Sequence, residues 1–379
     1  MAGSLAQRPG NGGHTWALLQ YVLGFQGLGW DVLFLDRLEP EMCQDEAGRP
    51  CSLESSVNLS YFIDVLERFG LVGNAALFYD GYRRTIGPAR LELLDRIGAS
   101  ALVLNVMGFL RDEELLEAAP LRVFLDIDPG FGQMWKMLGL ADLFSGHDRH
   151  VTIAENIGRP SCAVPTCGLE WVVTRQPVVL DHWPAVATPG ESVTSVASWR
   201  GPYDPIEYEG TTYGLRAHEF RAFAELPRLT GVPLEVALDI DRADAADLDL
   251  LQRNGWKVVD PRAVARDPDA YRRYIGGSFA EFSVAKNMYV RSHSGWFSDR
   301  SICYLASGRP VVAQDTGFSE HYRTGEGLLS FGTVEEARAA LEDVQASWSR
   351  HARAARRLAE DSFDSSVVLT SLLSRLGVA

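Results

Sequence analysis

Short apolar runs alternate with amphipathic segments along most of the chain. Apolar positions at helical spacing over residues 14–29 predict a helix that ends at Gly29, and the run 31–36 predicts a buried strand. The same alternation predicts further helices and strands, at 54–69 and 88–97 for helices and at 75–79, 101–105 and 122–128 for strands. Strands that alternate with helices in this way are typical of a doubly wound parallel sheet.

A second series of alternating strands and helices follows a break in the pattern. Residues 158–190 contain five prolines and little helical periodicity, so we expect a connection between domains there. Beyond it the pattern predicts four strands (192–198, 234–238, 256–259 and 281–285), three intervening helices (215–226, 244–253 and 268–275) and two closing helices (333–359 and 364–376). The fold class is therefore α/β with two Rossmann-like, doubly wound domains. We place them at 1–175 and 176–360, with a C-terminal helix over 361–379.

Composition agrees with a two-domain globular protein and excludes some partners. The chain has 379 residues, 46% of them hydrophobic and 23% charged. A net charge of −14 without a cluster of basic residues disfavours nucleic acid as a partner. The 5 cysteines form no CxxC pair, so no metal site is predicted. Without a long apolar run or a signal peptide, we expect no membrane span and a cytoplasmic location.

The segment from His293 to Glu320 predicts an anion site. It combines a polar loop, a short helix, a buried strand and a second polar loop. A helix N-terminus presents unpaired N–H groups to anions, and such a start is favoured by the capping types Ser298, Asp299 and Ser301, with the cation of Arg300 beside them. Further cations lie just upstream, at Lys286 and Arg291. The alternative is one more strand–helix–strand unit with an exposed loop.

A glycine-rich loop at residues 10–13 offers a second candidate. Gly12 and Gly13 would allow the backbone to pass close to a ligand, and His14, at the start of the helix, could act as a general base. The alternatives are a tight turn and a surface or capping histidine. Only nine residues precede this loop, so either the first strand is short or residues upstream are missing.

Two strand ends supply the remaining candidates. Asp126 and Asp128 alternate at the end of one strand, so only one can face a cleft, and Asp128 is nearer the loop. It could orient a base or bind a sugar hydroxyl, or simply form the turn before Pro129. Arg200 ends the first strand of the second half and could hold a phosphate, or lie free on the surface. Cys303 is expected to be a buried, inert thiol.

Several of these motifs resemble those of nucleotide-sugar glycosyltransferases. Residues 293–298 resemble the H-x-G-W-x-S box of the family-1 enzymes, and residues 306–312 resemble the A-x-G-x-P-V-V that follows it there and in family 4. Residues 315–320 resemble the sugar-contacting loop, and Gly13-His14 with residues 29–32 resemble the opening motif of the superfamily. The resemblance implies the GT-B fold, two Rossmann-like domains facing a cleft, with the C-terminal helix crossing back to the first domain.

The resemblance also implies roles for individual residues. A nucleoside-diphosphate sugar, with UDP or TDP as its nucleotide, would be the donor, bound without a cofactor or metal. Its diphosphate would contact His293 and Ser298, and its nucleotide would lie near Trp296. The donor side of the cleft would include residues from the whole segment and its surroundings: Gly295, Asp315, Thr316, Gly317 and Glu320 in addition to the cations and caps named above. His14, paired with an aspartate such as Asp128, would deprotonate the acceptor.

The sequence departs from both families at the ribose position. Ile302 and Cys303 stand where a glutamate usually binds the ribose, and Gly295 and Cys303 stand where the family-4 enzymes have paired glutamates. The function expected is transfer of a sugar to a hydroxyl of a small-molecule or glycan acceptor, inverting if His14 is the base. The alternatives are a sugar-nucleotide epimerase on the same fold and a non-catalytic GT-B partner protein. The oligomeric state stays open.

Overall fold

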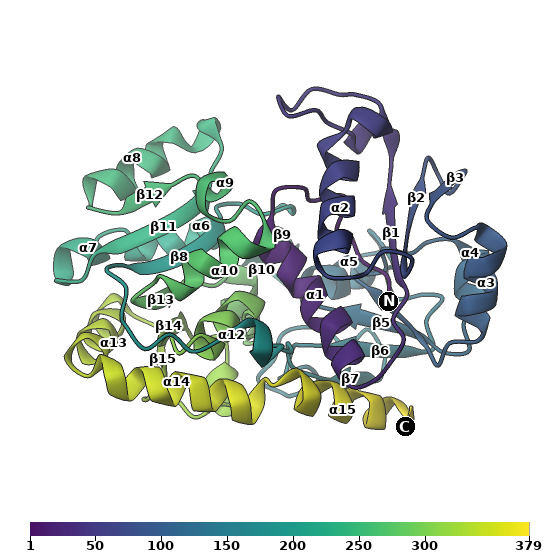
Figure 1. Cartoon of the computed structure of the whole chain (residues 1–379). Coiled ribbons are helices and arrows are strands. Elements are labelled where there is room, and N and C mark those ends of the chain that lie inside the picture. The colour runs from purple at the N-terminus through teal and green to yellow at the C-terminus, as the bar shows by residue number, and fades with distance from the viewer. Residues whose placement is uncertain (379) are drawn as a thin grey trace.

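The chain forms two lobes, and each lobe is built on parallel strands covered by helices (Figure 1). The structure is a computed structural model that describes residues 1–378. We refer to the part that carries β1–β7 as the N-terminal lobe and to the part that carries β8–β15 as the C-terminal lobe. The predicted α/β class with two Rossmann-like domains is confirmed.

The N-terminal lobe holds two groups of strands that a single bridge joins. One group has the order β1-β2-β3 and the other the order β4-β5-β6-β7. Ala2 lies between them and pairs in parallel with both Leu35 and Asn105, so the first strand of the lobe is reduced to this bridge. The strands are β1 (Phe34–Leu38), β2 (Ala75–Tyr79), β3 (Arg84–Ile86), β4 (Val103–Val106), β5 (Arg122–Asp126), β6 (Arg149–Thr152) and β7 (Trp171–Val173). The helices are α1 (Gly12–Gly27), α2 (Val57–Arg68), α3 (Arg90–Gly98), α4 (Glu113–Glu117) and α5 (Phe131–Met137).

The C-terminal lobe has one fully parallel sheet in the order β12-β11-β8-β13-β14-β15. By position in the chain this is 3-2-1-4-5-6, so the strand order reverses between β8 and β13, where open α/β sheets bind ligands. The strands are β8 (Val193–Ser198), β11 (Leu234–Asp239), β12 (Lys257–Val259), β13 (Ala280–Ser283), β14 (Val311–Gln314) and β15 (Leu328–Phe331). A separate hairpin, β9 (Ile206–Tyr208) and β10 (Thr211–Tyr213), follows β8.

The helices of the C-terminal lobe surround this sheet and extend beneath the other lobe. They are α6 (Arg216–Phe220), α7 (Leu226–Leu229), α8 (Ala245–Arg253), α9 (Pro261–Val264), α10 (Pro268–Gly276), α11 (Asn287–Ser292), α12 (Asp299–Ala306), α13 (Val334–Ala346), α14 (Trp348–Ser362) and α15 (Ser365–Leu376). The single helix predicted over 333–359 is therefore wrong: it is interrupted at Ser347, which caps α14. In Figure 1, α14 and α15 run in yellow along the base of both lobes. There α15 packs on α1 and β7.

Strands β8 and β13 separate at the point of strand-order reversal, and an arginine fills the gap. Their pairing ends at Glu281 and Thr194, which leaves the next carbonyl of β8, Val196 O, without a strand partner in β13. The guanidinium of Arg300 donates to Val196 O at 2.9 Å, to Glu281 Oε1 at 2.5 Å and to Ser283 Oγ at 2.7 Å. Arg300 is 7% exposed and its charge is neutralised by Glu281, so this arginine holds the split sheet together.

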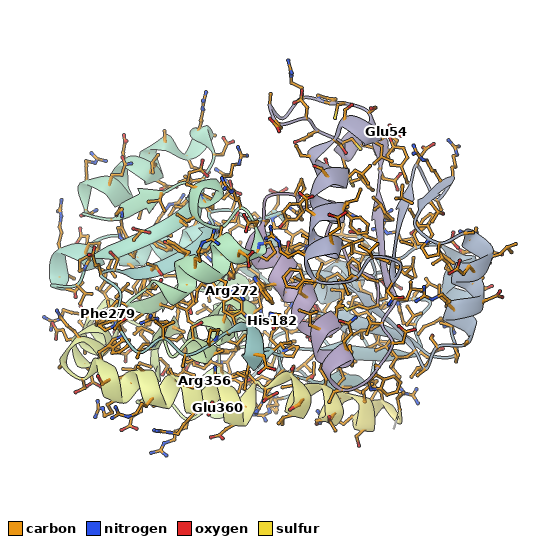
Figure 2. The ribbon with its side chains drawn as sticks, in the orientation of Figure 1. Glu54, His182, Arg272, Phe279, Arg356 and Glu360 are labelled. Atoms are coloured by element: carbon orange, nitrogen blue, oxygen red, sulfur yellow. The ribbon has the colours of Figure 1, made fainter. Side chains whose placement is uncertain are left out.

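Arginine side chains hold the connection between the lobes by donating hydrogen bonds to backbone carbonyls. Arg356 of α14, labelled in Figure 2, lies on the helix that runs beneath both lobes. It donates from Nη1 to Trp183 O at 2.8 Å and to Ala306 O at 2.7 Å, which joins the connection to the end of α12. Arg309 donates to Thr188 O at 2.8 Å. The ring of His182 in the connection lies 5.5 Å from that of Trp16 in α1. The connection is therefore part of the packed core, which restricts movement of the lobes.

Helix α1 is the element of the N-terminal lobe that docks most closely on the C-terminal lobe. Gly12 N donates to Ala265 O at 2.8 Å, and Trp16 Nε1 donates to Pro268 O at 2.8 Å. A Cβ atom on Gly12 would lie 2.2 Å from Asp267 O, closer than any two such atoms can approach. The glycine at this position is therefore required by the contact between the lobes.

We predict that Gly12→Ala destabilises the protein by about 1–3 kcal/mol, because backbone of one lobe must move away from backbone of the other. Gly27→Ala, at the other end of α1, is the matched control: nothing lies within 4 Å of its added Cβ, so it should leave stability unchanged or raise it slightly. Urea denaturation of the two variants measures the difference. Equal stabilities would contradict a direct contact at Gly12.

Candidate active site

A cleft of about 1450 Å³ lies between the lobes at the carboxyl ends of β8, β11 and β12. The N-terminal lobe contributes the glycine-rich loop and the start of α1. The C-terminal lobe contributes the strand ends, the first residues of α6 and α12, and the loops around α8 and α9. The lining residues with chemistry to offer are Arg8, Gly13, His14, Trp199, Arg200, Arg216, Asp239, Asp241, Arg242, Asp244, Asp260, Arg262, Tyr271, Asp299 and Arg300.

The N-terminus of α12 opens into this cleft. Ser298 caps the helix by accepting a hydrogen bond from Arg300 N at 3.2 Å, as its residue type predicts. Asp299 follows in the first turn, and burial raises the pKa of its carboxyl group. The first-turn N–H groups and the helix dipole make this end favourable for an anion.

Arg216 is the most unusual residue of the cleft. It begins α6, whose second residue Ala217 donates to Trp199 O at 3.1 Å and so holds the helix against the end of β8. The side chain is 9% exposed, yet its Nε is buried without a hydrogen-bond partner, and within residues 1–378 it has no ion-pair partner. Burial, with Arg300 acting in the same direction, lowers the pKa of Arg216 to about 10. A buried, unpaired cation that lines a cleft is a ready site for an anionic ligand.

His14 faces the same cleft from the N-terminal lobe. Its Nε2 lies 3.2 Å from Ser4 O and 3.1 Å from Ser4 Oγ. A carbonyl oxygen can only accept, so we assign the hydrogen to Nε2 and the free lone pair to Nδ1. Burial lowers the pKa of His14 to about 4, the cation of Arg8 adds to this effect, and the hydrogen bond to Ser4 opposes it. The imidazole is therefore neutral at physiological pH, with an unprotonated Nδ1, and it is a weaker base in this conformation than a free histidine.

Arg200 and Arg300 also line the cleft, but both have partners. Arg200 forms a bidentate pair with Asp244, at 2.7 and 2.6 Å. Arg300 is paired with Glu281 in the split between the strands. Neither guanidinium is free in this conformation, so a phosphate would have to compete with a carboxylate at each of them.

Asp128 and Lys286 form a cluster between the lobes and outside the lining of the cleft. Lys286 Nζ lies 2.6 Å from Asp128 Oδ2, and the hydroxyl of Tyr289 donates to the same carboxylate. Trp296 stacks on Tyr289 with ring centroids 4.2 Å apart. The structure thus brings three predicted residues together, as a contact that joins the lobes.

The remaining predicted donor residues lie in a second contact with the N-terminal lobe. His293 Nε2 is 2.8 Å from Glu320 Oε1, and Glu320 also pairs with Arg159 at 3.0 Å. The nearby loops pack against Asn156: a Cβ atom on Gly295 or on Gly317 would lie within 3 Å of its atoms. In the same region Asp315 accepts from Gly317 N, Thr316 donates to Trp296 O, and Arg291 donates to Thr212 O.

Two further residues of α12 face away from the cleft. The hydroxyl of Ser301 is buried and has no partner within residues 1–378. Cys303 is 2% exposed, it accepts from Gln20 Nε2 at 3.6 Å, and burial raises the pKa of its thiol well above the usual value. Gly12 is not among the residues that line the cleft, and it contacts Ala265 and Asp267.

Within residues 1–378 no three side chains of the His, Cys, Asp or Glu types come together in a way that could hold a metal ion. No helix in this part of the chain has both the length and the hydropathy to cross a bilayer.

The overall structure is similar to several solved structures, although no protein-family model and no curated protein sequence matches the chain. HepE from Anabaena in complex with UDP-glucose superposes with a TM-score of 0.59 at 12% identity, over 99% of this chain and 98% of that one. Sucrose-phosphate synthase from Thermosynechococcus elongatus gives 0.55 at 12% identity, over 99% and 98%. An alpha-glucosyltransferase in complex with UDP-glucose and DNA containing an abasic site gives 0.60 at 12% identity, over 100% and 98%.

The chain has the GT-B fold. In this fold the cleft described above lies between the two Rossmann-like domains, and α15 returns to the first of them.

Among the residues of this cleft that sequence reasoning missed are Arg216 and Asp239. Arg216 lies inside a segment predicted as an ordinary helix, and nothing in its neighbours marks its burial. Asp239 ends a predicted strand, which is a position that could have been noticed, because the acidic residue that contacts a ribose in Rossmann domains ends the second strand.

The lowered pKa of His14 has a consequence for stability. Between pH 6.5 and pH 4 the unfolded chain binds a proton at His14 that the folded protein does not, so stability falls as the pH falls through this range. We predict that His14→Gln loses about 2 kcal/mol less stability than the natural protein between pH 7 and pH 5. Chemical denaturation at the two pH values measures this. An identical loss in both proteins would contradict the burial of a neutral imidazole.

Proposed function

We propose that the protein is a glycosyltransferase that moves a sugar from a nucleoside-diphosphate sugar to a hydroxyl group of an acceptor. The observation that carries this proposal is Arg216, a buried cation without a partner beside the N-terminus of α12. Together they offer a positive charge and the positive end of a helix dipole to one anionic group of a ligand. A diphosphate has the charge and the number of oxygens to use both.

The reaction begins with the acceptor hydroxyl held on the His14 side of the cleft. As its oxygen attacks the anomeric carbon, the bond from that carbon to the phosphate oxygen breaks and the nucleoside diphosphate leaves with the electron pair. The hydroxyl proton passes to the free Nδ1 of His14, and Nε2 stays hydrogen-bonded to Ser4. Arg216 and the first turn of α12 stabilise the negative charge that develops on the leaving group.

The geometry does not favour an epimerase on the same fold. That chemistry needs acidic groups gathered beside the sugar. Asp128 is bound to Lys286 and Tyr289, Glu320 is bound to His293 and Arg159, and none of the carboxylates named from the sequence, Asp128, Asp315 and Glu320, lines the cleft. Of the aspartates that do line it, Asp244 is paired with Arg200, and Asp241, Asp260 and Asp299 cap or begin helices.

The charge of Arg216 predicts opposite effects of one substitution on stability and on binding. Arg216→Met should raise the stability of the unliganded protein by about 1–3 kcal/mol, because it removes an unpaired buried charge. In the natural protein, a nucleoside diphosphate at 100 times its Kd should raise stability by about 2.7 kcal/mol. This gain should be largely lost in the variant.

Thermal unfolding with a panel of UDP, TDP, GDP and ADP tests both effects. Arg357→Met is the matched control, since Arg357 is exposed on α14 and away from the cleft. It should behave like the natural protein in both respects. If none of the nucleotides shifts the unfolding temperature, the proposal is wrong.

The role of His14 is tested by turnover and binding measured on the same variant. His14→Gln should lower kcat by roughly 10²–10⁴-fold and leave nucleotide affinity within about a factor of two, because the side chain acts on the acceptor proton. If turnover persists at the natural rate, another group is the base. Loss of nucleotide affinity as well would indicate a structural role for His14.

A further inference from the structure

One carboxylate that lines the cleft has no hydrogen-bond or ion-pair partner within residues 1–378. Asp239 ends β11, its side chain is exposed and lines the cleft, and within residues 1–378 its oxygens take part in no hydrogen bond or ion pair. Its backbone is fixed, because Asp239 O accepts from Trp199 N at 2.8 Å and the residue pairs with Ser198 of β8. The carboxylate is therefore presented at a defined place in the cleft with both oxygens available.

The other carboxylates of the cleft are already occupied. Asp244 holds Arg200 with both of its oxygens. Asp241 accepts from Ala243 N at 2.7 Å and caps a short 3₁₀ helix. Asp260 accepts from Arg262 N at 2.8 Å, and Asp299, in the first turn of α12, accepts from Ser298 Oγ at 3.5 Å.

The position of Asp239 matches a general rule of Rossmann domains. In the order 3-2-1-4-5-6, the second strand ends beside the ribose of the bound nucleotide, and an acidic residue at that end accepts hydrogen bonds from the ribose hydroxyls. Here β11 is the second strand of the sheet. The diphosphate site at α12 follows β13, two strand positions away and about 10 Å across the sheet.

The residue of α12 at the expected ribose position, Cys303, is not available to a ribose in this protein. Cys303 occupies the position of the expected glutamate, and it is a buried thiol that contacts Gln20 and Asp299 O. A thiol is a weak acceptor and this one is closed off from the cleft, so Cys303 cannot accept hydrogen bonds from the ribose hydroxyls.

We propose that Asp239 binds the ribose 2′- and 3′-hydroxyl groups of the donor, and that the donor nucleotide is therefore a ribonucleotide rather than a deoxyribonucleotide. The two carboxylate oxygens accept one hydrogen bond from each hydroxyl of the cis-diol, while Arg216 binds the diphosphate. This assignment rests on the proposed function, since it requires a nucleoside diphosphate in the cleft.

The test compares each ribonucleoside diphosphate with its 2′-deoxy counterpart by isothermal titration. UDP, GDP and ADP are titrated first, and the tightest is then compared with dUDP, dGDP or dADP; TDP is included as a natural deoxyribonucleotide. In the natural protein the ribonucleotide should bind roughly 10- to 100-fold more tightly than the deoxy form, as expected for a hydrogen bond to a charged group.

Asp239→Ala should remove most of this preference, so that the ratio of the two Kd values falls close to one. Because the side chain is exposed, the variant should fold normally. Asp249→Ala, an exposed aspartate on α8 outside the cleft, should keep the preference. Loss of Arg216 should weaken both nucleotides equally and leave the ratio unchanged.

The outcomes separate this inference from the proposed function. Three results would overturn the ribose assignment and leave the proposed function standing. They are equal affinity for the ribonucleotide and its deoxy form, tighter binding of TDP, and a preference for the ribonucleotide that survives Asp239→Ala. Absence of binding by every nucleoside diphosphate would overturn both.

Discussion

The docking of α1 onto the C-terminal lobe is the contact on which the rest of the site depends. It places backbone of Gly12 directly against Ala265 and Asp267, and it places His14 at the edge of the cleft that Arg216 lines. The buried clusters around Trp16 and around Asp128, Lys286 and Tyr289 extend the contact along both sides of the cleft. The cleft is consequently a space between two surfaces whose separation is fixed by close packing.

The two buried arginines of the cleft, Arg300 and Arg216, differ in whether their charge has a partner. Where β8 and β13 part, the protein satisfies Arg300 fully with Glu281, Ser283 and a backbone carbonyl. A short distance along the chain from β8, Arg216 is equally buried and has no such partner. A buried charge without a partner lowers the stability of the folded protein. The place of Arg216 beside the N-terminus of α12 therefore supports the proposal that an anionic ligand completes the site. Asp239 differs in being exposed, and its free oxygens complement hydroxyl groups.

The sequence predicted the architecture better than the site. Alternation of apolar and amphipathic segments is a local signal, and it located β2, β8, β11 and α10 to within a residue or two. Capping by Ser298 also follows from its residue type. The separation of His293, Glu320 and Asp128 from the cleft does not, because it depends on which loops of one lobe meet the other. The burial of Arg216 depends on the same long-range packing, so no motif around it could have revealed it.

A crystal structure of the protein with a bound nucleoside diphosphate tests the central claim most directly. The account predicts diphosphate oxygens about 3 Å from the guanidinium of Arg216 and from the first-turn N–H groups of α12, with the nucleoside extending toward β11. A diphosphate bound elsewhere, with Arg216 still lacking a partner, would contradict the account.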